Sequence, residues 1–342
     1  MMILHLCKHD KFIPGLIDFM RRHFAHQDHA FITYGDKAAY PYAEGADTIH
    51  FDDLRPARKQ LRKAMERADK IILHCFYNPP LSRLLFLNPE LARKCYWSIW
   101  GYDLYKFRET PGTLHGHINE FCRRSAMKNF RGIISCVEGD AKLARHAYGM
   151  TAPFHECISY TSNLYNGGFA DKTSNECLSI QIGNSADPSN NHMEVMDRLR
   201  PYKDENILIY CPLSYGDAVY AKDVEERGRE LFGTRFVAIK NFMSPKNYRK
   251  LQSSIDIAIF AHHRQQGMGN IITLLGMGKK VYMRSNVTTW DCLKKCGAEL
   301  YDLEELDLTR IAPDVAAKNN LAIAGYFSEE NMASQYAVIF RS

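Results

Sequence analysis

The chain has 342 residues, which at roughly 100–200 residues per domain predicts two domains. Apolar residues make up 46% and charged residues 24%, values that exclude a disordered, collagen-like or low-complexity chain. The 44 basic and 39 acidic residues leave a net charge of +5, which is too small to indicate a nucleic-acid partner but suits an anionic substrate or membrane surface.

Short apolar runs alternate with longer amphipathic segments along the first part of the chain. Apolar runs of four to seven residues predict strands, and apolar residues three or four apart predict helices. The predicted strands are 2–7, 30–35, 48–51, 70–76, 95–101 and 131–137, and the predicted helices are 11–24, 54–68, 80–87, 114–129 and 139–149.

The polar segment 160–176, which contains Gly167 and Gly168, predicts a linker. The alternation then restarts, with strands expected at 177–183, 206–212, 235–240, 255–261 and 279–284. The helices of this part are expected near 189–200, 218–232, 245–253, 268–277 and 287–296, with a helical stretch from about 311 to the end.

Strands that alternate with helices of this length form parallel βαβ units. The predicted fold class is therefore α/β, with two Rossmann-like, doubly wound domains at 1–165 and 166–325. We expect residues 326–342 to form a C-terminal helix that could pack back on the first domain. Because ligands of such sheets bind beyond the carboxyl ends of the strands, we expect the substrate in a cleft between the domains.

The cysteines indicate a reducing compartment. Cys7, Cys75, Cys136 and Cys211 lie in apolar runs and are predicted to be buried thiols. Cys292 and Cys296 have no second pair to complete a zinc site. No apolar run reaches the roughly 18 residues of a transmembrane helix. We therefore expect a cytoplasmic protein with neither a bound metal nor a cofactor, whose membrane contact would be peripheral.

A first candidate anion site follows the strand 177–183. Its sequence, Gly183-Asn184-Ser185, combines a residue that permits close backbone approach with short polar side chains. Ser189 or Asn190 could cap the next helix, whose free N-terminus would favour an anion. Ordinary helix capping is the more common role of such a turn.

A second candidate lies between the strand 255–261 and the helix that starts near 268. Backbone N–H groups from Gly267 to Asn270 would face a ligand at the helix N-terminus, and Arg264 would add a fork of donors. The spacing fits neither a P-loop nor a dinucleotide fingerprint. A plain loop remains the alternative.

Two further candidates follow strands of the first half. Trp100, Gly101, Tyr102 and Asp103 place aromatic rings beside a carboxylate, which suits a sugar; an aromatic core edge with a capping aspartate is equally compatible. His74 ends the strand 70–76, where it could be a base, a phosphate ligand or a buried core histidine.

The helix 54–68 carries a basic face, because it contains six basic residues and one acidic residue, Glu66. A second basic cluster is formed by Arg123, Arg124, Lys128 and Arg131. A basic face beside an apolar one could lie on anionic lipid, although a solvated helix face is the more common explanation.

Four blocks carry a resemblance to a known family: HCFYNP (74–79), SIWGYDLY (98–105), IGNSADPSNNH (182–192) and IFAHHRQQGMGN (259–270). In order and spacing they resemble glycosyltransferase family 56, the 4-alpha-L-fucosyltransferase-like family. The resemblance implies a GT-B fold and metal-independent transfer of a deoxyamino sugar. N-acetylfucosamine would move from a TDP-linked donor to a polyprenyl-diphosphate-linked saccharide of enterobacterial common antigen, at the inner membrane face.

The resemblance also assigns residues. In the second domain it implies contacts to the nucleoside diphosphate sugar by Gly183, Asn184, Ser185, Pro212, Tyr215, Arg264, Gln265, Gln266, Gly267, Gly269 and Asn270. In the first domain, Asn78, Trp100, Tyr102 and Tyr105 would meet the lipid-linked acceptor. No nucleic-acid partner is expected.

The sequence thus predicts a glycosyltransferase, with Asp103 as the first candidate for the catalytic base and His74 as the second. If the reaction retains configuration, both would instead position groups. Two alternatives stay open: a soluble GT-B transferase acting on a protein or another glycan, and a non-catalytic protein that binds nucleotide sugars.

Overall fold

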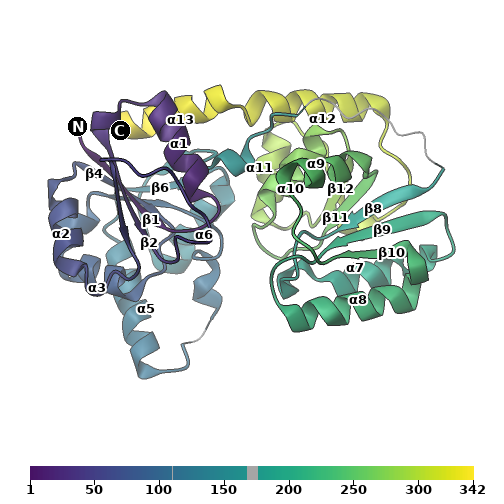
Figure 1. Ribbon diagram of the computed structural model, residues 1–342, viewed down its shortest axis with the longest axis horizontal. Helices are drawn as coiled ribbons and strands as arrows, with labels where there is room; N and C mark the ends of the chain where they lie inside the picture. The colour runs from purple at the N-terminus through teal and green to yellow at the C-terminus, as the bar shows by residue number, and fades with distance from the viewer. Residues whose placement is uncertain (110, 168–175) are drawn as a thin grey trace. The chain divides into compact units, whose positions relative to one another are not determined.

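The computed structural model describes residues 1–109, 111–167 and 176–342 (Figure 1). Part of the predicted linker, residues 168–175, lies outside the described residues. The chain divides into two compact units. Unit 1 comprises Met1–Leu164 together with Glu329–Ser342, and unit 2 comprises Tyr165–Ser328.

Unit 1 contains a parallel sheet. Its strands are β1 (Ile3–Lys8), β2 (His29–Tyr34), β3 (Thr48–Phe51), β4 (Lys70–His74), β5 (Cys95–Ser98), β6 (Gly132–Ser135) and β7 (Phe154–Glu156). They pair in the order β3-β2-β1-β4-β5-β6-β7. Its helices are α1 (Ile13–His23), α2 (Arg58–Arg67), α3 (Pro79–Leu87), α4 (Pro89–Ala92), α5 (Leu114–Met127), α6 (Glu138–Tyr148) and α13 (Glu329–Arg341). The short 3-10 helices are η1 (His26–Asp28), η2 (Tyr105–Arg108) and η3 (Thr161–Asn163).

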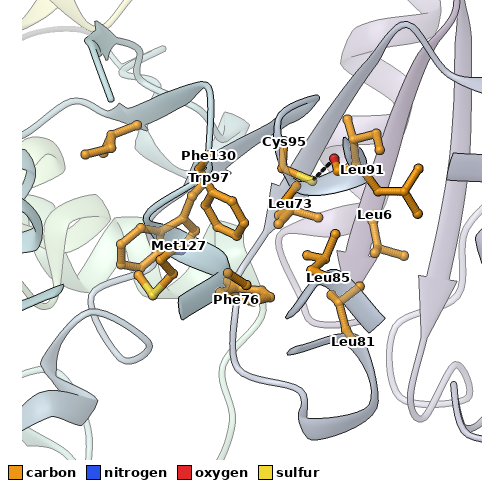
Figure 2. Close-up of a cluster of buried hydrophobic side chains, with 14 of the residues drawn as sticks. Leu6, Leu73, Phe76, Leu81, Leu85, Leu91, Cys95, Trp97, Met127 and Phe130 are labelled. Carbon is orange, nitrogen blue, oxygen red and sulfur yellow. Dashed lines mark hydrogen bonds between the residues drawn. The ribbon is translucent and has the colours of Figure 1, made fainter. Parts of the chain in front are cut away.

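Alternating side chains give the sheet of unit 1 two different faces, because successive residues of a strand point to opposite sides. Leu6 and Leu73 belong to a buried core with residues of α2, α3, α5 and α6, part of which is shown in Figure 2. His5 points to the other face, where its ring lies 6.1 Å from that of Phe340 in α13. α1 contributes to that face as well, since Phe19 contacts Tyr336 of α13.

Unit 2 repeats the plan. Its strands are β8 (Leu178–Ile182), β9 (Ile207–Pro212), β10 (Phe236–Ile239), β11 (Ile257–Phe260), β12 (Lys280–Met283) and β13 (Tyr301–Asp302). They pair in parallel in the order β10-β9-β8-β11-β12-β13. The helices are α7 (His192–Leu199), α8 (Ala218–Phe232), α9 (Pro245–Ser254), α10 (Met268–Gly276), α11 (Thr288–Lys295) and α12 (Pro313–Tyr326), with 3-10 turns η4 (Pro188–Asn190), η5 (Arg200–Tyr202), η6 (Gly233–Arg235) and η7 (Leu303–Glu305). In Figure 1, α7 and α8 cover one face of the sheet, and α9, α10 and α12 cover the other.

Each predicted strand and helix has a counterpart in the structure, and both sheets are parallel as the alternation predicted. The predicted C-terminal helical stretch is two helices, interrupted at Phe327 and Ser328. The prediction missed β7 and β13, which have three and two residues and are too short to show a period. Cys7, Cys75, Cys136 and Cys211 are all buried.

In both sheets the strand order reverses beside the first strand, so that successive strands are added first on one side of it and then on the other. β1 lies between β2 and β4, and β8 lies between β9 and β11. Loops that leave the carboxyl ends of the two strands at such a switch point diverge and leave a crevice for a ligand. In the described part of the chain, no helix has both the length and the apolar character needed to cross a bilayer.

Candidate functional site

In unit 2 the switch point joins the two predicted anion loops, which are about 80 residues apart in the sequence. The Gly183 N–H donates to Ile259 O at 2.9 Å, and Asn191 Nδ2 donates to Ala261 O at 2.7 Å. His262 Nε2 lies 2.9 Å from Asn190 Oδ1. The loop after β8 is therefore hydrogen-bonded to the end of β11 and the loop that follows it.

The first loop requires a glycine at position 183. Gly183 has a φ of 63°, a conformation that residues with a Cβ atom rarely adopt. A Cβ there would lie 2.5 Å from His192 Nε2 and 2.8 Å from Asn190 Oδ1. The Asn190 carboxamide also accepts the Asn184 N–H at 2.9 Å, so it organises the turn around Gly183.

The second loop ends at the N-terminus of α10, where Gly267 has a φ of 68° and no side chain caps the helix. A Cβ at Gly267 would lie 2.9 Å from Asn184 Oδ1. Asn184 Nδ2 donates to the Tyr215 hydroxyl at 3.1 Å, and within the described residues Asn184 Oδ1 has no hydrogen-bond partner. Because a tyrosine hydroxyl both donates and accepts, the amide can present either its oxygen or its NH2 to a ligand beside the helix start.

Positive charge adjoins this helix start. Arg264 makes two long hydrogen bonds of 3.4 Å, to Gln265 O and Ser189 Oγ, so its guanidinium keeps donors for a ligand. Ser189 Oγ donates to Asp187 Oδ1 at 2.5 Å and lies 2.6 Å from Gln266 Oε1. Burial raises the pKa of Asp187, but the hydrogen bonds from Ser189 and the charge of Arg264 outweigh it and lower the pKa overall.

Two histidines at this site are held neutral. Burial lowers the pKa of His262 to about 3, with a smaller contribution from Arg264. Burial lowers the pKa of His192 to about 4, and its Nε2 has no partner among the described residues. Buried polar atoms are nearly always hydrogen-bonded, so an unpaired imidazole nitrogen and an unpaired amide oxygen at one loop junction favour a ligand site.

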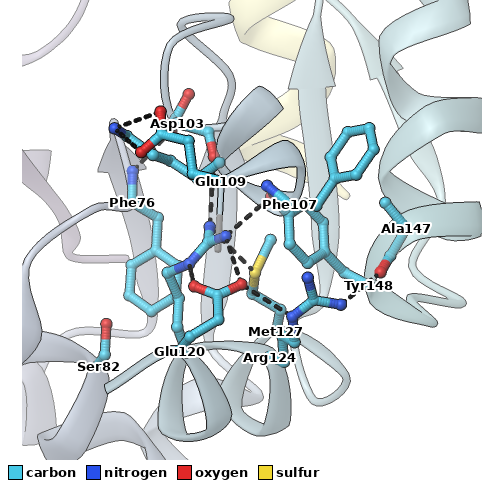
Figure 3. A network of polar contacts seen from close by, with 12 residues as sticks. Phe76, Ser82, Asp103, Phe107, Glu109, Glu120, Arg124, Met127, Ala147 and Tyr148 are labelled. Atoms are coloured by element: carbon cyan, nitrogen blue, oxygen red, sulfur yellow. Dashed lines mark hydrogen bonds and ion pairs between the residues drawn. The ribbon is translucent and has the colours of Figure 1, made fainter. Parts of the chain in front are cut away.

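Asp103, the predicted base, is fully buried in unit 1 (Figure 3). Its Oδ2 accepts the Phe76 N–H at 2.7 Å and the Trp97 Nε1–H at 2.6 Å, and its Oδ1 accepts the Trp100 N–H at 3.0 Å. These donors tie the loop after β5 to the loop after β4. The geometry favours a positioning role for Asp103 over the predicted base, because three protein donors already engage the two oxygens of this fully buried carboxylate.

His74 is also fully buried. Its Nε2 lies 3.1 Å from His5 Nδ1, and its Nδ1 lies 2.9 Å from the Tyr160 hydroxyl. His5 Nε2 continues the chain to His29 Nδ1 at 3.0 Å. Burial lowers the pKa of His74 to about 3, and Trp100 Nε1 donates to the same Tyr160 hydroxyl. His74 is therefore a neutral core histidine that orients Tyr160, and its predicted role as a base does not fit this burial.

These buried histidines predict an acid-sensitive fold. Burial lowers the pKa of His74 and of His262 to about 3, from about 6.5 for a histidine in water. Between these values the unfolded chain binds protons that the native state does not, so stability falls as pH falls. At about one pH unit below 6.5 each histidine should remove about 1.4 kcal/mol from the free energy of unfolding. The full stability returns above 6.5.

Urea unfolding on both sides of pH 6.5 measures this loss. His74→Gln and His262→Gln should each flatten the pH dependence, whereas the exposed His117→Gln should leave it unchanged. Equal pH dependence in all of these variants would contradict the assignment.

A pocket of about 290 Å³ lies in unit 1 between α3, η2 and α5. Asn78, Tyr77, Lys106, Glu109 and Arg123 are among its lining residues. Lys106 donates to both Glu109 carboxylate oxygens at 2.8 Å, and its Nζ lies 4.1 Å from the centre of the Tyr102 ring. The pocket therefore combines an aromatic ring, Tyr77, with charged and amide groups, the mixed lining that small-molecule sites use.

The comparisons with known proteins settle the family. A family model described as 4-alpha-L-fucosyltransferase, glycosyl transferase group 56, matches residues 20–330. The chain belongs to this family. The predicted resemblance is thereby confirmed, and the chain is a glycosyltransferase. Membership supports sugar transfer from a nucleotide sugar.

Solved structures confirm the GT-B fold class of this family 56 protein. Sucrose-phosphate synthase from Thermosynechococcus elongatus matches with a TM-score of 0.72 at 10% identity, covering 99% of this chain and 98% of that one. Anabaena HepE in complex with UDP and glucose matches with a TM-score of 0.67 at 14% identity, covering 100% of both chains. A glycosyltransferase from Rickettsia africae matches with a TM-score of 0.66 at 12% identity, covering 99% and 97%.

The family 56 residues predicted to bind the donor fall into two groups. The residues that come together at the switch point are Gly183, Asn184, Tyr215, Arg264, Gln266 and Gly267. The others hold the framework or lie further out, as described next.

Ser185 is buried, and its Oγ accepts Asn190 Nδ2 at 3.1 Å. Asn270 Oδ1 accepts the Tyr248 hydroxyl at 2.7 Å and Gln252 Nε2 at 3.0 Å, so it joins α9 to α10. Gly269 is in the first turn of α10, where its carbonyl accepts Thr273 Oγ1 at 2.7 Å. Pro212 is buried at the end of β9, and the Gln265 carbonyl accepts from Arg264.

The predicted acceptor residues are similarly divided. Asn78 lines the pocket and caps α3 by accepting the Leu81 N–H at 3.1 Å. Tyr102 stands over Lys106 and is 46% exposed. Trp100 is half-buried against Phe12, and Tyr105 is buried.

The sequence did not predict that Asn190, His192 and His262 surround the turn at Gly183. Two sequence signals could have found them: their place just after strands 177–183 and 255–261, and their membership of the family blocks 182–192 and 259–270. Among the described residues, no three His, Cys, Asp or Glu side chains gather as a metal site requires.

Proposed function

We propose that this family 56 enzyme transfers a deoxyamino sugar such as N-acetylfucosamine from a nucleoside diphosphate, with TDP as the expected nucleotide. The acceptor would be a polyprenyl-diphosphate-linked saccharide of a bacterial surface polysaccharide, enterobacterial common antigen, at the cytoplasmic membrane face. The observation that best supports this proposal is that the loops after β8 and β11 meet beside the N-terminus of α10, which no side chain caps. Support for a nucleotide donor comes from HepE, which was solved with UDP and glucose.

The donor diphosphate would lie at the start of α10. The Asn270 N–H donates to Gly267 O at 2.9 Å, so the N–H groups that precede it would face the diphosphate, and the helix dipole favours an anion there. Arg264 would supply charge-assisted hydrogen bonds to the phosphate oxygens. As the glycosidic bond to the nucleotide breaks, charge develops on the leaving diphosphate, and these fixed donors would stabilise it without a metal ion.

The remaining contacts would orient the donor. The Asn184 amide, with its unpaired oxygen, would bind the sugar or a phosphate, and Pro212 and Tyr215 would flank the base. In unit 1, the pocket lined by Asn78 and Tyr77 would hold the acceptor saccharide. Asp103 and His74 would position Trp100 and Tyr160 rather than exchange protons with the substrate.

Arg264→Ala should weaken nucleotide binding about tenfold to a hundredfold, because a hydrogen bond to a charged group contributes about 1.5–3 kcal/mol. Thermal shift with TDP, UDP and GDP measures this, since a ligand at about 100 times its Kd stabilises by about 2.7 kcal/mol. Arg227→Ala, on α8 and paired with Asp197 and Glu230, is the matched control and should bind like the wild type.

Unchanged binding by Arg264→Ala would move the diphosphate elsewhere. Transfer should also persist in EDTA; loss of activity that manganese restores would remove the metal-free part of the proposal. Nucleotide binding without transfer to any lipid-linked or free glycan would instead indicate a binding protein.

A further inference from the structure

The outer face of α5 is apolar. Leu114, Ile118 and Phe121 are 78%, 47% and 60% exposed. Their spacing of four and three residues places them along one face of the helix. Phe86 and Leu87, at the end of α3, are 37% and 64% exposed, and the Phe86 and Phe121 rings are 5.6 Å apart. We call these five residues the α5 surface.

The inner face of α5 already meets the core. Cys122, Arg123, Ala126 and Met127 are buried. A surface helix ordinarily shows polar residues on the side opposite its buried face. Because α5 has large apolar residues on both sides, the second side is not explained by folding of unit 1, and such exposed patches mark interaction surfaces.

The charges beside the α5 surface are mostly positive. Arg83 on α3, Arg124 on α5 and Lys128 just after α5 lie beside the α5 surface, and α3 and α5 together contain one carboxylate, Glu120. Glu120 accepts from both Arg123 and Arg124 at 2.8 Å, and Arg83 donates to Asn119 and contacts His115 rather than a carboxylate. Apolar side chains with a cationic border match the interface of an anionic bilayer.

The helix 54–68, for which lipid contact was one of two interpretations of the sequence, lacks this combination. In α2 the apolar residues Leu61 and Met65 are buried in the core, so the exposed face carries polar and charged groups only. The basic face of α2 therefore has no large apolar side chain to insert into a membrane.

We infer that the α5 surface docks unit 1 on an anionic membrane. This inference deepens the proposed function, because α5 also lines the unit 1 pocket through Gly116, Asn119 and Arg123. One helix would thus contact the bilayer with its outer face and the saccharide of a lipid-linked acceptor with residues of its inner face.

A second copy of the chain is the rival occupant. Two copies joined by a two-fold axis present the same patch to each other, so the cationic border of one would face the cationic border of the other. Like charges in such a contact oppose association, whereas anionic lipid headgroups neutralise them.

Co-sedimentation with vesicles tests the docking. The intact protein should pellet with phosphatidylglycerol-containing vesicles, pellet far less with phosphatidylcholine alone, and release as salt rises. Combining Leu114→Ser, Ile118→Ser and Phe121→Ser should weaken vesicle binding at least about tenfold, since insertion depends on apolar burial. Matched controls are Leu321→Ser on α12 and Val338→Ser on α13, which are 73% and 61% exposed and should bind normally.

Phe121→Trp gives a second readout that preserves an apolar side chain. Its fluorescence should shift to the blue only when anionic vesicles are added. Absence of vesicle binding by the wild type, or equal binding by the triple variant, overturns the inference. If light scattering shows that the wild type is a dimer and the triple variant a monomer, the inference is overturned and the α5 surface is instead a self-association surface.

These outcomes are separate from those of the proposed function. Stabilisation of the same triple variant by TDP reports on unit 2, and a urea unfolding curve like that of the wild type shows that its unit 1 is folded. Nucleotide binding with no vesicle binding would refute the docking alone, whereas failure of the wild type to bind any nucleotide would refute the donor site alone.

Discussion

Replacing Asp103 by alanine is expected to lower the free energy of unfolding by about 3–5 kcal/mol. The carboxylate accepts three hydrogen bonds while fully buried, so alanine leaves the Phe76 and Trp100 N–H groups and the Trp97 indole N–H without an acceptor. Urea unfolding measures the loss. Asp52→Ala, at a fully exposed carboxylate, should change stability by less than about 0.5 kcal/mol.

Asp103→Asn separates positioning from proton transfer. The amide oxygen can keep the two donors of Oδ2, while the amide NH2 faces the Trp100 N–H, so about 1–3 kcal/mol should be lost. If Asp103 positions Trp100, kcat/KM falls but the acidic limb of its pH profile keeps its position. A normal unfolding curve combined with loss of that limb would restore the base originally predicted from the sequence.

Gly183→Ala is the second large effect we expect. Gly183 and Gly149 have φ values of 63° and 67°, so an alanine at either position meets a backbone cost of about 1–2 kcal/mol. At Gly183 the Cβ would also lie 2.5 Å from His192 Nε2, whereas at Gly149 the nearest atom is Lys128 Cε at 3.4 Å. Overpacking should add about 1–3 kcal/mol at Gly183 alone.

Urea unfolding and nucleotide thermal shift together measure this pair. Gly183→Ala should lose more stability than Gly149→Ala and should also lose stabilisation by TDP, because the new methyl group displaces the Asn190 and His192 side chains beside Asn184. Equal losses in the two variants, or full nucleotide binding by Gly183→Ala, would show that the loop tolerates the change and is not a close-fitting ligand site.

The strand and helix order was within reach of the sequence because it depends on neighbouring residues. Apolar runs such as 70–76 and helical spacings such as 218–232 are local patterns, and their alternation leads to parallel sheets. Gly183 and Gly267 were identifiable in the same way, as glycines between a strand end and a helix start. The family motifs then pointed to the same two loops.

Tertiary packing decided what the local pattern left open. The charge of Asp103 suggested a base, but it is fully buried among three donors, two from the loops after β4 and β5 and one from β5 itself. A local pattern does not show this burial, because Phe76 is 27 residues away from Asp103 and the Trp100 contact forms only when the loop after β5 folds.

The two amphipathic helices α2 and α5 illustrate the same limit. An apolar stripe at helical spacing appears in both sequences, yet Leu61 of α2 is 1% exposed and Phe121 of α5 is 60% exposed. By itself the sequence determined which elements form and in which order, because those are short-range properties. Which apolar face is covered, and which loops meet beside β8, depends on the strand order of the sheet, since only the folded sheet brings distant segments into contact.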